Sequence, residues 1–399
     1  MKWLIIIDKY IPDVVGGNVI YIERFIKGLI ELGHEVVLLV STNRTDCPEY
    51  EKFDNFEIYR IYVKEGSIGP LRVKNRNLLT QKFLSLIDNN NFDVVNTHTA
   101  YLLNLNFLRE RKKKYNFKLV STFHAVHTYE LLFDMQKYLS FGAINYRELA
   151  VFPVKFILSY IFEYNSFKYA DSIIVMSKYV KNTVTKFFGD KFLDKVLVSA
   201  IGVSKIKNLE PISKQEAGKK LQLNTDETLF LTVRRLVPRM GLFNMIKAFS
   251  LIENNSARLL IVGKGELYGK LDKYIKKLNL QNKINLLGFV DNDLLHYYYS
   301  AADCFILPTE QLEGFGIVTI EALSYNVPVI GTPRGATPEI LEKFDKNLIT
   351  KSHLSKDIAE KIEYFLVNKD KYSDINYKDL VNSEYDWTSI INKIIDFIK

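Results

Sequence analysis

Short, almost continuously apolar runs alternate along the chain with longer stretches in which apolar residues recur every three or four positions. Continuous runs are typical of strands covered on both faces, and the spaced pattern is typical of the covering helices. Strand-like runs in the first half occupy 2–8, 35–42, 92–98, 117–124, 171–177 and 195–202, and those in the second half occupy 228–235, 258–265, 283–289, 303–309 and 327–333. This alternation predicts βαβ units, and therefore an α/β fold with doubly wound parallel sheets.

The two halves are separated by a polar stretch at 203–227 that contains no strand-like run. A chain of 399 residues is also too long for one ordinary hydrophobic core. We therefore predict two Rossmann-like domains, at residues 1–205 and 222–384, joined by a connection that ends in a short helix.

The composition is that of a soluble globular protein, with 47% hydrophobic and 25% charged residues. Five apolar residues before Asp8 are too few for a signal peptide or a membrane span, so we expect a cytoplasmic protein. Cys47 and Cys304 are too few for a disulfide framework and are interpreted as reduced thiols.

Positive charge is concentrated in the first half, where 27 Lys and Arg against 21 Asp and Glu give a net of +6. The excess lies mainly at 101–200 and includes the basic cluster at 109–114. A basic face can meet phosphate groups, nucleic acid or an anionic membrane, or it can simply be solvated. We predict no nucleic-acid partner. The aromatic and basic region 101–170 predicts either helices that cover the first sheet or peripheral contact with a membrane.

Candidate functional residues fall at the ends of the predicted strands. Ligands of open parallel sheets bind beyond the carboxyl ends of the strands. Residues at such positions are Gly16, Gly17, His98, His124, Arg234, Arg235 and Glu313.

The stretch 313–321, "EGFGIVTIE", places one carboxylate in a glycine turn and a second in the helix that follows. A helix start at Gly316 offers backbone N–H groups and a positive dipole end to a phosphate, and Gly314 and Gly316 permit close approach of the backbone. Carboxylates only accept hydrogen bonds, which suits sugar hydroxyls. Glu313 and Glu321 are therefore predicted to hold hydroxyl groups on either side of a diphosphate.

Several segments in this order resemble the retaining GT-B glycosyltransferases of family 4. The stretch "EGFGIVTIE" matches the E-x7-E motif of that family, and "PVIGTPRGATPEIL" matches its usual sequel. The segments "LTVRRLVPRMG", "LLIVGKGE" and "INLLGFV" resemble its arginine segment, next strand and base-contacting turn. In the first half, "PDVVGGN", "DVVNTH" and "STFH" are similar to its diglycine loop and histidine-ended strands. The closing residues 385–399 resemble a helix that crosses back onto the first domain.

The resemblance implies a GT-B fold, in which a cleft between two domains holds a nucleotide-diphosphate sugar. Arg235 would neutralise the diphosphate leaving group, His124 would lie near the reacting sugar, and Glu313 and Glu321 would hold the sugar and the ribose. The residues implied to meet the donor through their backbone are Gly16, Gly17, Phe315, Gly316 and Ile317.

Residue 240 departs from the family pattern, which commonly has a phosphate-binding lysine there. A thioether cannot neutralise charge, so Met240 leaves this role open. We hypothesise that Arg239 or Arg234 supplies the missing cation.

The family further implies metal-independent transfer with retained stereochemistry, from a UDP- or GDP-sugar, to a glycan, lipid-linked or small-molecule acceptor. The alternatives are a nucleotide-sugar epimerase and a non-catalytic partner protein of the same architecture.

Short motifs of other classes fit less well. Residues 263–269 have the spacing G-x-G-x-x-x-G on a later strand, which disfavours a nicotinamide cofactor. The aspartates of "DND" at 291–293 are interpreted as a helix start rather than a metal site. His98, His124 and His127 lack a cysteine or carboxylate partner in the sequence pattern, so no metal site is predicted.

Overall fold

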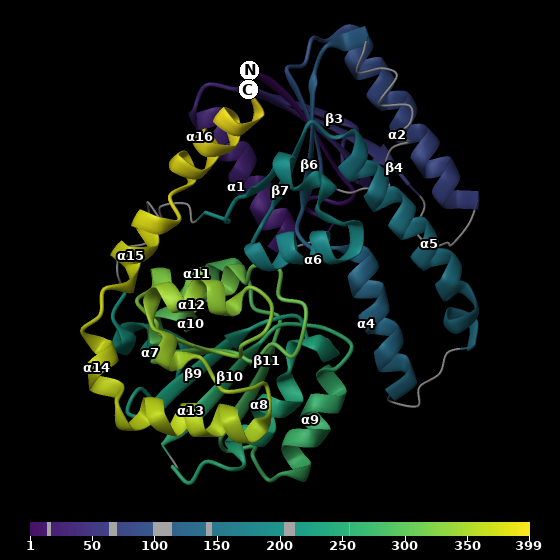
Figure 1. Ribbon diagram of the computed structural model, residues 1–399. Coiled ribbons are helices and arrows are strands. Elements are labelled where there is room, and N and C mark those ends of the chain that lie inside the picture. Colours follow the sequence, from purple (N-terminus) through teal and green to yellow (C-terminus); the bar gives the residue numbers. More distant parts are fainter. Residues whose placement is uncertain (14–16, 64–69, 99–113, 141–145, 203–211, 255) are drawn as a thin grey trace. The chain divides into compact units, whose positions relative to one another are not determined.

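The computed structural model describes residues 1–13, 17–63, 70–98, 114–140, 146–202, 212–254 and 256–399 (Figure 1). The chain divides into two compact units. The first unit contains Met1–Gly202 and Trp387–Lys399, and the second contains Val203–Asp386. Each unit is built around its own sheet and is described separately below.

The sheet of the first unit has eight strands in the order β3-β4-β2-β1-β5-β6-β7-β8. They are β1 (Lys2–Ile7), β2 (Glu35–Thr42), β3 (Tyr50–Phe53), β4 (Phe56–Tyr62), β5 (Val94–Thr97), β6 (Lys118–Phe123), β7 (Ser172–Val175) and β8 (Val196–Val198). All neighbouring strands pair in parallel except β3, which is antiparallel to β4. The order reverses at β1, which lies between β2 and β5, so the switch point of this sheet is at the carboxyl ends of β1 and β5.

The hairpin β3–β4 was missed by the sequence analysis. Its signal is a short turn, Asp54–Asn55, between two aromatic-rich segments. The hairpin is held partly by aromatic pairs across the strands, with ring centroids 4.7 Å apart for Tyr50 and Tyr59 and 5.9 Å apart for Phe53 and Phe56. β3 is an edge strand and is largely exposed, and β4 beside it alternates buried and partly exposed residues, so neither carries the continuous apolar run of the predicted strands.

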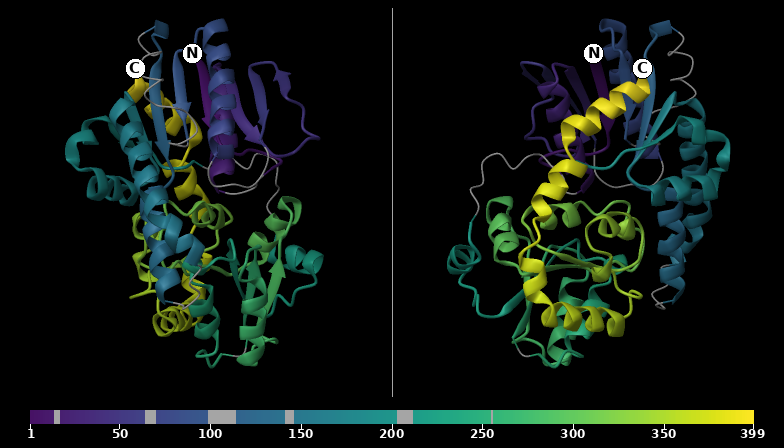
Figure 2. Two further views of the ribbon diagram at one scale, coloured as in Figure 1. Left: turned by 90° about the vertical axis from the view of Figure 1, so that its right-hand side faces the viewer. Right: turned by 60° about the vertical axis from the view of Figure 1, so that its left-hand side comes forward.

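Helices cover both faces of the first sheet and bury the apolar residues of its strands. They are α1 (Gly17–Glu31), α2 (Pro70–Asn89), α4 (His127–Ser140), α5 (Tyr146–Tyr169), α6 (Lys178–Phe188) and α16 (Trp387–Ile398), with the 3-10 turn η1 (Asp190–Lys195). The last helix, α16, packs alongside α1 (Figure 1, Figure 2), where the Trp387 ring lies 5.5 Å from that of Tyr21. The end of the chain therefore belongs to the core of the first unit.

The sheet of the second unit has five parallel strands in the order β11-β10-β9-β12-β13. They are β9 (Thr228–Val233), β10 (Ala257–Val262), β11 (Ile284–Gly288), β12 (Cys304–Leu307) and β13 (Val329–Gly331). The chain proceeds outward from β9 to β11 and then returns to the other side of β9 as β12. The switch point therefore lies between β9 and β12, where a ligand of a doubly wound sheet is expected.

Helices and 3-10 turns connect the strands of the second unit. They are α7 (Lys214–Leu221), η2 (Pro238–Met240), α8 (Leu242–Phe249), α9 (Tyr268–Lys277), α10 (Asn292–Ala301), α11 (Ile317–Ser324), α12 (Thr337–Phe344), η3 (Lys346–Leu348), α13 (Ser355–Val367), α14 (Lys369–Ser373) and α15 (Tyr377–Glu384). Helices α8, α9 and α13 contribute to the main described buried cluster of the second unit, together with β9, β10 and β12. Helix α10 begins at Asn292, so the "DND" segment is a helix start as predicted, although Asp291 makes no side-chain cap bond.

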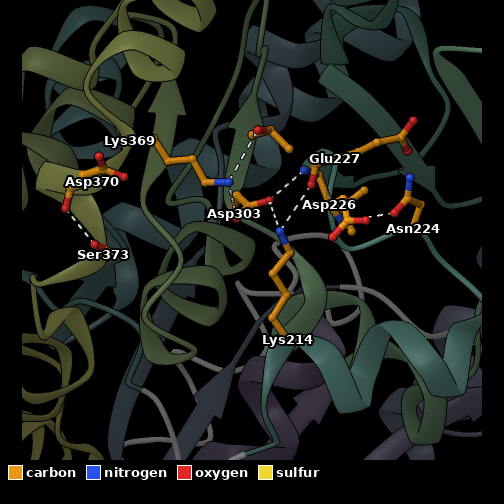
Figure 3. Close-up of polar contacts among 10 residues, drawn as sticks. Lys214, Asn224, Asp226, Glu227, Asp303, Lys369, Asp370 and Ser373 are labelled. Atoms are coloured by element: carbon orange, nitrogen blue, oxygen red, sulfur yellow. Dashed lines mark hydrogen bonds and ion pairs between the residues drawn. The ribbon is translucent and has the colours of Figure 1, made fainter. Parts of the chain in front are cut away.

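Asp303, at the amino end of β12, ties α7 and α14 to the second sheet (Figure 3). Its carboxylate accepts hydrogen bonds from Lys214 Nζ at 2.7 Å and from the backbone N–H of Leu229 at 2.8 Å, and Lys369 Nζ lies 3.0 Å away. The Asp303 side chain is only 9% exposed. The contact joins helices that are distant in sequence at the edge opposite the switch-point loops, so its role is structural.

We expect Asp303→Ala to lower the free energy of unfolding by about 2 kcal/mol, because it leaves two lysines and a backbone N–H without their shared acceptor. Urea titration followed by circular dichroism measures the change. Asp226→Ala is the matched control, since Asp226 is an exposed aspartate in the turn that precedes β9. A loss no larger than that of the control would show that the lysines are satisfied by solvent.

Within the described residues, no helix combines the length and the hydropathy needed to cross a lipid bilayer.

Candidate functional site

Glu313 lies in the loop between β12 and α11, at the switch point of the second sheet. Helix α11 begins at Ile317 after Gly316, which has a φ of 85° and occupies the N-cap position without any side-chain cap. A left-handed backbone at this position favours glycine. The first N–H groups of the helix have no carbonyl partner within it, and the helix dipole adds positive potential there. The helix start at which the sequence predicts phosphate binding is therefore present and carries no side-chain cap.

The backbone of Glu313 is fixed by the turn that precedes α12. The N–H of Ala336 donates to the Glu313 carbonyl at 2.8 Å. Gly335 has a φ of 60°, and a Cβ atom there would lie 2.3 Å from the same carbonyl oxygen. Only glycine permits this approach, so the "PRGATPE" segment serves to position the loop that carries Glu313.

The Glu313 carboxylate points toward the carboxyl end of β9. Its Oε2 accepts hydrogen bonds from Arg234 Nη2 at 2.5 Å and from Thr309 Oγ1 at 3.1 Å. The side chains are 4% exposed for Arg234 and 14% exposed for Glu313. An ion pair this deeply buried has lost most of its hydration, so its geometry depends on both partners. Thr309 was not identified from the sequence.

Arg234 also lies against Met240, with the sulfur 3.2 Å from Nε and 2.8 Å from Nη2. Its third nitrogen, Nη1, is buried and has no hydrogen-bond partner. A buried guanidinium N–H without an acceptor is costly and is usually satisfied by a ligand or a water. The guanidinium of Arg234 therefore lies beside Met240, at the position where the family that the sequence resembles commonly has a phosphate-binding lysine.

Arg239 has a different role from Arg234. Its Nη1 donates to the carbonyl of Leu312 at 2.7 Å, and its own carbonyl accepts from the N–H groups of Glu310 and Gln311. These contacts fasten the 3-10 turn η2 to the loop that carries Glu313. Arg239 therefore holds the loop, which makes Arg234 the better candidate for the missing cation.

The other predicted residues of the second unit surround the same loop. Arg235 follows Arg234 and is exposed. Glu321 is half-buried in α11, with its Oε2 3.4 Å from the hydroxyl of Tyr299, a neighbour the sequence analysis did not identify. Phe315 is buried and packs edge-on against Tyr385 at 6.0 Å, so its side chain belongs to the core and its backbone alone can meet a ligand.

In the first unit, the two strand-end histidines are brought together. Strands β5 and β6 are parallel neighbours, and His98 and His124 follow their ends. His98 Nδ1 lies 3.2 Å from His124 Nε2, and the His124 ring packs edge-on against Tyr21 at 4.9 Å. Gly17 is the first residue of α1, and Gly16 lies outside the described residues, as do residues 109–113 of the basic cluster.

Burial keeps both imidazoles neutral at physiological pH. Desolvation lowers the pKa of His124 to about 4, and desolvation together with His124 lowers the pKa of His98 well below its usual range. Two neutral rings can share one proton in the hydrogen bond between them. Because Nε2 of His124 is occupied by this bond, Nδ1 is the nitrogen that His124 can offer to a ligand.

We expect the free energy of unfolding to fall as the pH is lowered from 6.5 to 4. The unfolded chain binds protons at these histidines near pH 6.5, whereas folded His124 does so only near pH 4, so protons favour the unfolded state. The lowered pKa of His124 alone should lower the free energy of unfolding by about 3 kcal/mol between these pH values. Urea titrations across this range measure the slope, and His98→Asn/His124→Asn should flatten it. An unchanged slope in that variant would assign the acid sensitivity to other groups.

His127 lies outside the His98–His124 pair. It begins α4, where Glu163 of α5 accepts hydrogen bonds from the N–H groups of His127 and Thr128 and from the Thr128 hydroxyl. Burial raises the pKa of Glu163 despite these donors. The sequence gives no signal for this cap, because the acid lies on another helix. No group of three or more potential metal ligands occurs among the residues that the structure describes.

Comparison with known proteins accounts for both units. Glycosyltransferase Family 4 matches residues 15–198, and Glycosyl transferases group 1 matches residues 213–379. An uncharacterized glycosyltransferase of Methanocaldococcus jannaschii is 24% identical over 416 residues, which cover 100% of this chain and 98% of the relative.

Two solved structures share the fold along the whole chain. Sucrose-phosphate synthase from Thermosynechococcus elongatus superposes with a TM-score of 0.79 at 18% identity, covering 99% of this chain and 97% of that one. HepE from Anabaena, in complex with UDP and glucose, gives a TM-score of 0.70 at 18% identity and covers 99% and 98%. The predicted α/β fold with two parallel sheets is thereby confirmed as that of GT-B enzymes. The chain belongs to the GT-B glycosyltransferases of group 1 and family 4, and it is an enzyme of the hexosyltransferase type.

Proposed function

We propose that the second unit binds a nucleotide-diphosphate sugar and that the enzyme transfers the sugar with retention of its anomeric configuration. The observation that carries donor binding is the set of groups at the switch point of the second sheet, and retention is what the resemblance to family 4 implies. An uncapped helix start at Ile317, the guanidinium groups of Arg234 and Arg235, and the carboxylate of Glu313 follow neighbouring strands β9 and β12. Cations and free N–H groups suit a diphosphate, and a carboxylate suits sugar hydroxyls.

In this proposal each group has one task. Arg235 neutralises the charge that develops on the departing diphosphate, and the N–H groups at the start of α11 bind its oxygens. Glu313 holds hydroxyls of the transferred sugar, and Glu321 holds those of the ribose. In the first unit, Gly16 and Gly17 leave room for the donor phosphates, and His124 lies near the reacting sugar.

Transfer proceeds by attack of an acceptor hydroxyl on the anomeric carbon from the face that the diphosphate leaves. The bond from the anomeric carbon to the diphosphate breaks, a bond to the acceptor oxygen forms, and the acceptor proton passes to the departing phosphate oxygen. A glycosidase that retains configuration uses a second carboxylate as nucleophile, and the resemblance implies none here. We infer that the reaction needs no metal, because arginines and a helix start supply positive charge at the phosphates.

UDP-sugars are the first donors to test, since HepE is seen with UDP and glucose, and GDP-sugars are the next. The base would lie near the turn after β11, where Phe289 is exposed and Lys264 Nζ is 4.8 Å from its ring. The acceptor is proposed to be a glycan, a lipid-linked sugar or a small molecule. The enzyme would act in the cytoplasm or at the cytoplasmic face of a membrane.

A panel of nucleotide sugars tests the donor proposal by thermal shift. Ligand at about 100 times its dissociation constant stabilises the protein by about 2.7 kcal/mol, so a true donor should stand apart from the rest of the panel. Product analysis with that donor then follows the anomeric configuration by NMR. Release of an epimerised sugar in the absence of an acceptor would contradict the transferase proposal and support the alternative, a nucleotide-sugar epimerase. Stabilisation by none of the nucleotides would contradict donor binding.

Arg234 is proposed to supply the cation that the family takes from a lysine at position 240. We expect Arg234→Ala to weaken donor affinity by about 10²-fold, because a charge-assisted contact to phosphate is lost. Arg239→Ala should weaken it far less, since that side chain binds the Leu312 carbonyl. Isothermal titration with the donor identified by thermal shift measures both.

A compensating variant separates charge from structure. Adding Met240→Lys to Arg234→Ala places an ammonium group where the sulfur lies beside the guanidinium. Recovery of donor affinity in the double variant supports the proposal. Equal donor affinity of Arg234→Ala and the wild-type enzyme would contradict it, and a larger loss in Arg239→Ala would transfer the role to Arg239.

A further inference from the structure

Helix α5 carries a stripe of large apolar side chains that the first unit leaves exposed. Val154, Ile157, Leu158 and Ile161 are 57%, 56%, 47% and 45% exposed. Their spacing of three and four residues places them on one face of the helix across two turns. Monomeric soluble proteins rarely expose contiguous apolar patches of this kind, whereas surfaces that bind membranes or proteins do.

The opposite face of α5 is firmly packed, so the stripe has a fixed orientation. Ser159, Glu163 and Phe167 are 6%, 1% and 0% exposed and lie on that face. Glu163 caps α4 through the N–H groups of His127 and Thr128, and Phe167 stacks on Phe123 at 4.4 Å. Rotating the helix to bury the stripe would break these contacts. The exposure is therefore a property of the folded unit.

The charges around the stripe are basic. Among the described side chains of α5, residues 150–169, the exposed or half-buried charges are Lys155 and Lys168, and the acidic residue is the buried Glu163. Lys168 lies seven residues beyond Ile161, so it extends the same face by two turns. Tyr164 lies about one turn beyond Ile161, and its hydroxyl accepts a hydrogen bond from Lys191 Nζ of η1 at 3.2 Å. An apolar stripe bordered by lysines matches an anionic lipid surface.

Tyrosines accompany the stripe on its border. Tyr160 and Tyr164 are half-buried in α5, with ring centroids 6.3 Å apart, and Lys191 Nζ is 4.6 Å from the Tyr164 ring. Aromatic rings with a polar tip are favoured where hydrocarbon meets lipid headgroups. The face thus combines apolar, aromatic and basic side chains in the arrangement of a helix that lies in the plane of a membrane surface.

We propose that the exposed face of α5, defined by Val154, Ile157, Leu158 and Ile161, docks on an anionic lipid bilayer. The four side chains enter the headgroup boundary, and Lys155, Lys168 and Lys191 meet lipid phosphates. The docking adds a membrane surface to the proposed transferase and agrees with a lipid-linked acceptor. It does not depend on donor chemistry, because neither nucleotide nor acceptor takes part in the contact.

Vesicle flotation with the full chain tests the proposal without any substrate. The protein should float with vesicles of phosphatidylcholine and phosphatidylglycerol at low ionic strength, and weakly with phosphatidylcholine alone. Ile157→Asp/Leu158→Asp should lower the bound fraction at least about tenfold, because it places charge in the apolar contact. Lys155→Glu/Lys168→Glu should lower it at low salt. The matched control is Val367→Asp, at an apolar residue of α13 that is 85% exposed, and it should float like the wild type.

Three results would overturn the proposal. The first is that the wild type does not float at low salt, and the second is that Ile157→Asp/Leu158→Asp floats as well as the wild type. The third is that the wild type self-associates and does not bind vesicles, whereas Ile157→Asp/Leu158→Asp is monomeric. The last result, seen by sedimentation velocity, would identify the face as an interface between copies. Thermal shift with the nucleotide-sugar panel serves as an independent readout, since Ile157→Asp/Leu158→Asp should leave it unchanged. If no nucleotide sugar stabilised the wild type, the transferase proposal would be contradicted, and the lipid-binding result would be unaffected.

Discussion

Arg235→Ala is expected to lower kcat/KM about 10³-fold, with most of the loss in kcat. In the proposed reaction the departing diphosphate gains charge as its bond to the sugar breaks, and a guanidinium that receives this charge acts mainly in the transition state. A factor of 10³ corresponds to about 4 kcal/mol of lost stabilisation. Steady-state kinetics with the donor from the thermal-shift panel measures kcat and KM separately.

Charge and fold can be separated at this position. Arg235 is exposed, so its removal should leave the unfolding transition in place. Arg235→Lys keeps the charge without the planar fork and should recover part of the rate. Arg44→Ala, at an exposed arginine of the first unit, is the matched control and should keep full activity. A loss confined to KM would mean that Arg235 binds ground state and transition state alike, which contradicts the leaving-group role.

Eleven strands, among them the edge strands β8, β11 and β13, were predictable because a continuous apolar run marks each of them in the sequence. All eleven predicted runs contain a strand, from Lys2–Ile7 to Val329–Gly331. The hairpin of Tyr50–Phe53 and Phe56–Tyr62 was not predicted, because neither the largely exposed edge strand β3 nor the partly buried β4 beside it carries a continuous apolar run. Edge strands depend on pairing with a neighbour that sequence pattern alone does not specify.

The candidate site was predictable in outline, because the carboxyl ends of adjacent parallel strands must meet at one edge. The adjacency of β5 and β6 brings His98 and His124 to 3.2 Å. What the sequence did not reveal is which side chains bind one another. Arg234 and Glu313 are 79 positions apart, and Glu163 and His127 are 36 positions apart. Such contacts depend on rotamers and on the depth of each loop in the folded unit, and local spacing carries no information about either.

The pairing of Arg234 with Glu313 changes how variants of the acid should be interpreted. In the structure the carboxylate that is proposed to hold the sugar already accepts two hydrogen bonds at Oε2. Arg234 therefore orients the acid, and under the proposed role of Glu313 this would lower the entropy lost when a sugar hydroxyl binds. Removing one member of the pair would also leave an unpaired buried charge in the second unit. A variant at either residue thus alters stability as well as turnover, and both must be measured.

Glu313→Gln is expected to lower kcat/KM by about 10²- to 10³-fold and the free energy of unfolding by about 3 kcal/mol. Glutamine keeps the shape but removes the charge, so sugar hydroxyls lose their stronger acceptor. The Arg234 guanidinium, 4% exposed, is left buried without a counter-charge, and breaking one side of a buried ion pair is strongly destabilising. Kinetics at a temperature well below the unfolding transition and urea titration measure the two effects independently.

A double variant shows which effect belongs to function. Arg234→Met/Glu313→Gln removes both charges, so much of the lost stability should return, because neither member is left as an unpaired buried ion. Turnover should stay at the level of Glu313→Gln or below, since no carboxylate holds the sugar. Glu310→Gln, in the same loop, is the matched control for the amide and should keep both rate and stability. If turnover returned with stability in the double variant, Glu313 would be a structural partner of Arg234 and would not hold the donor sugar.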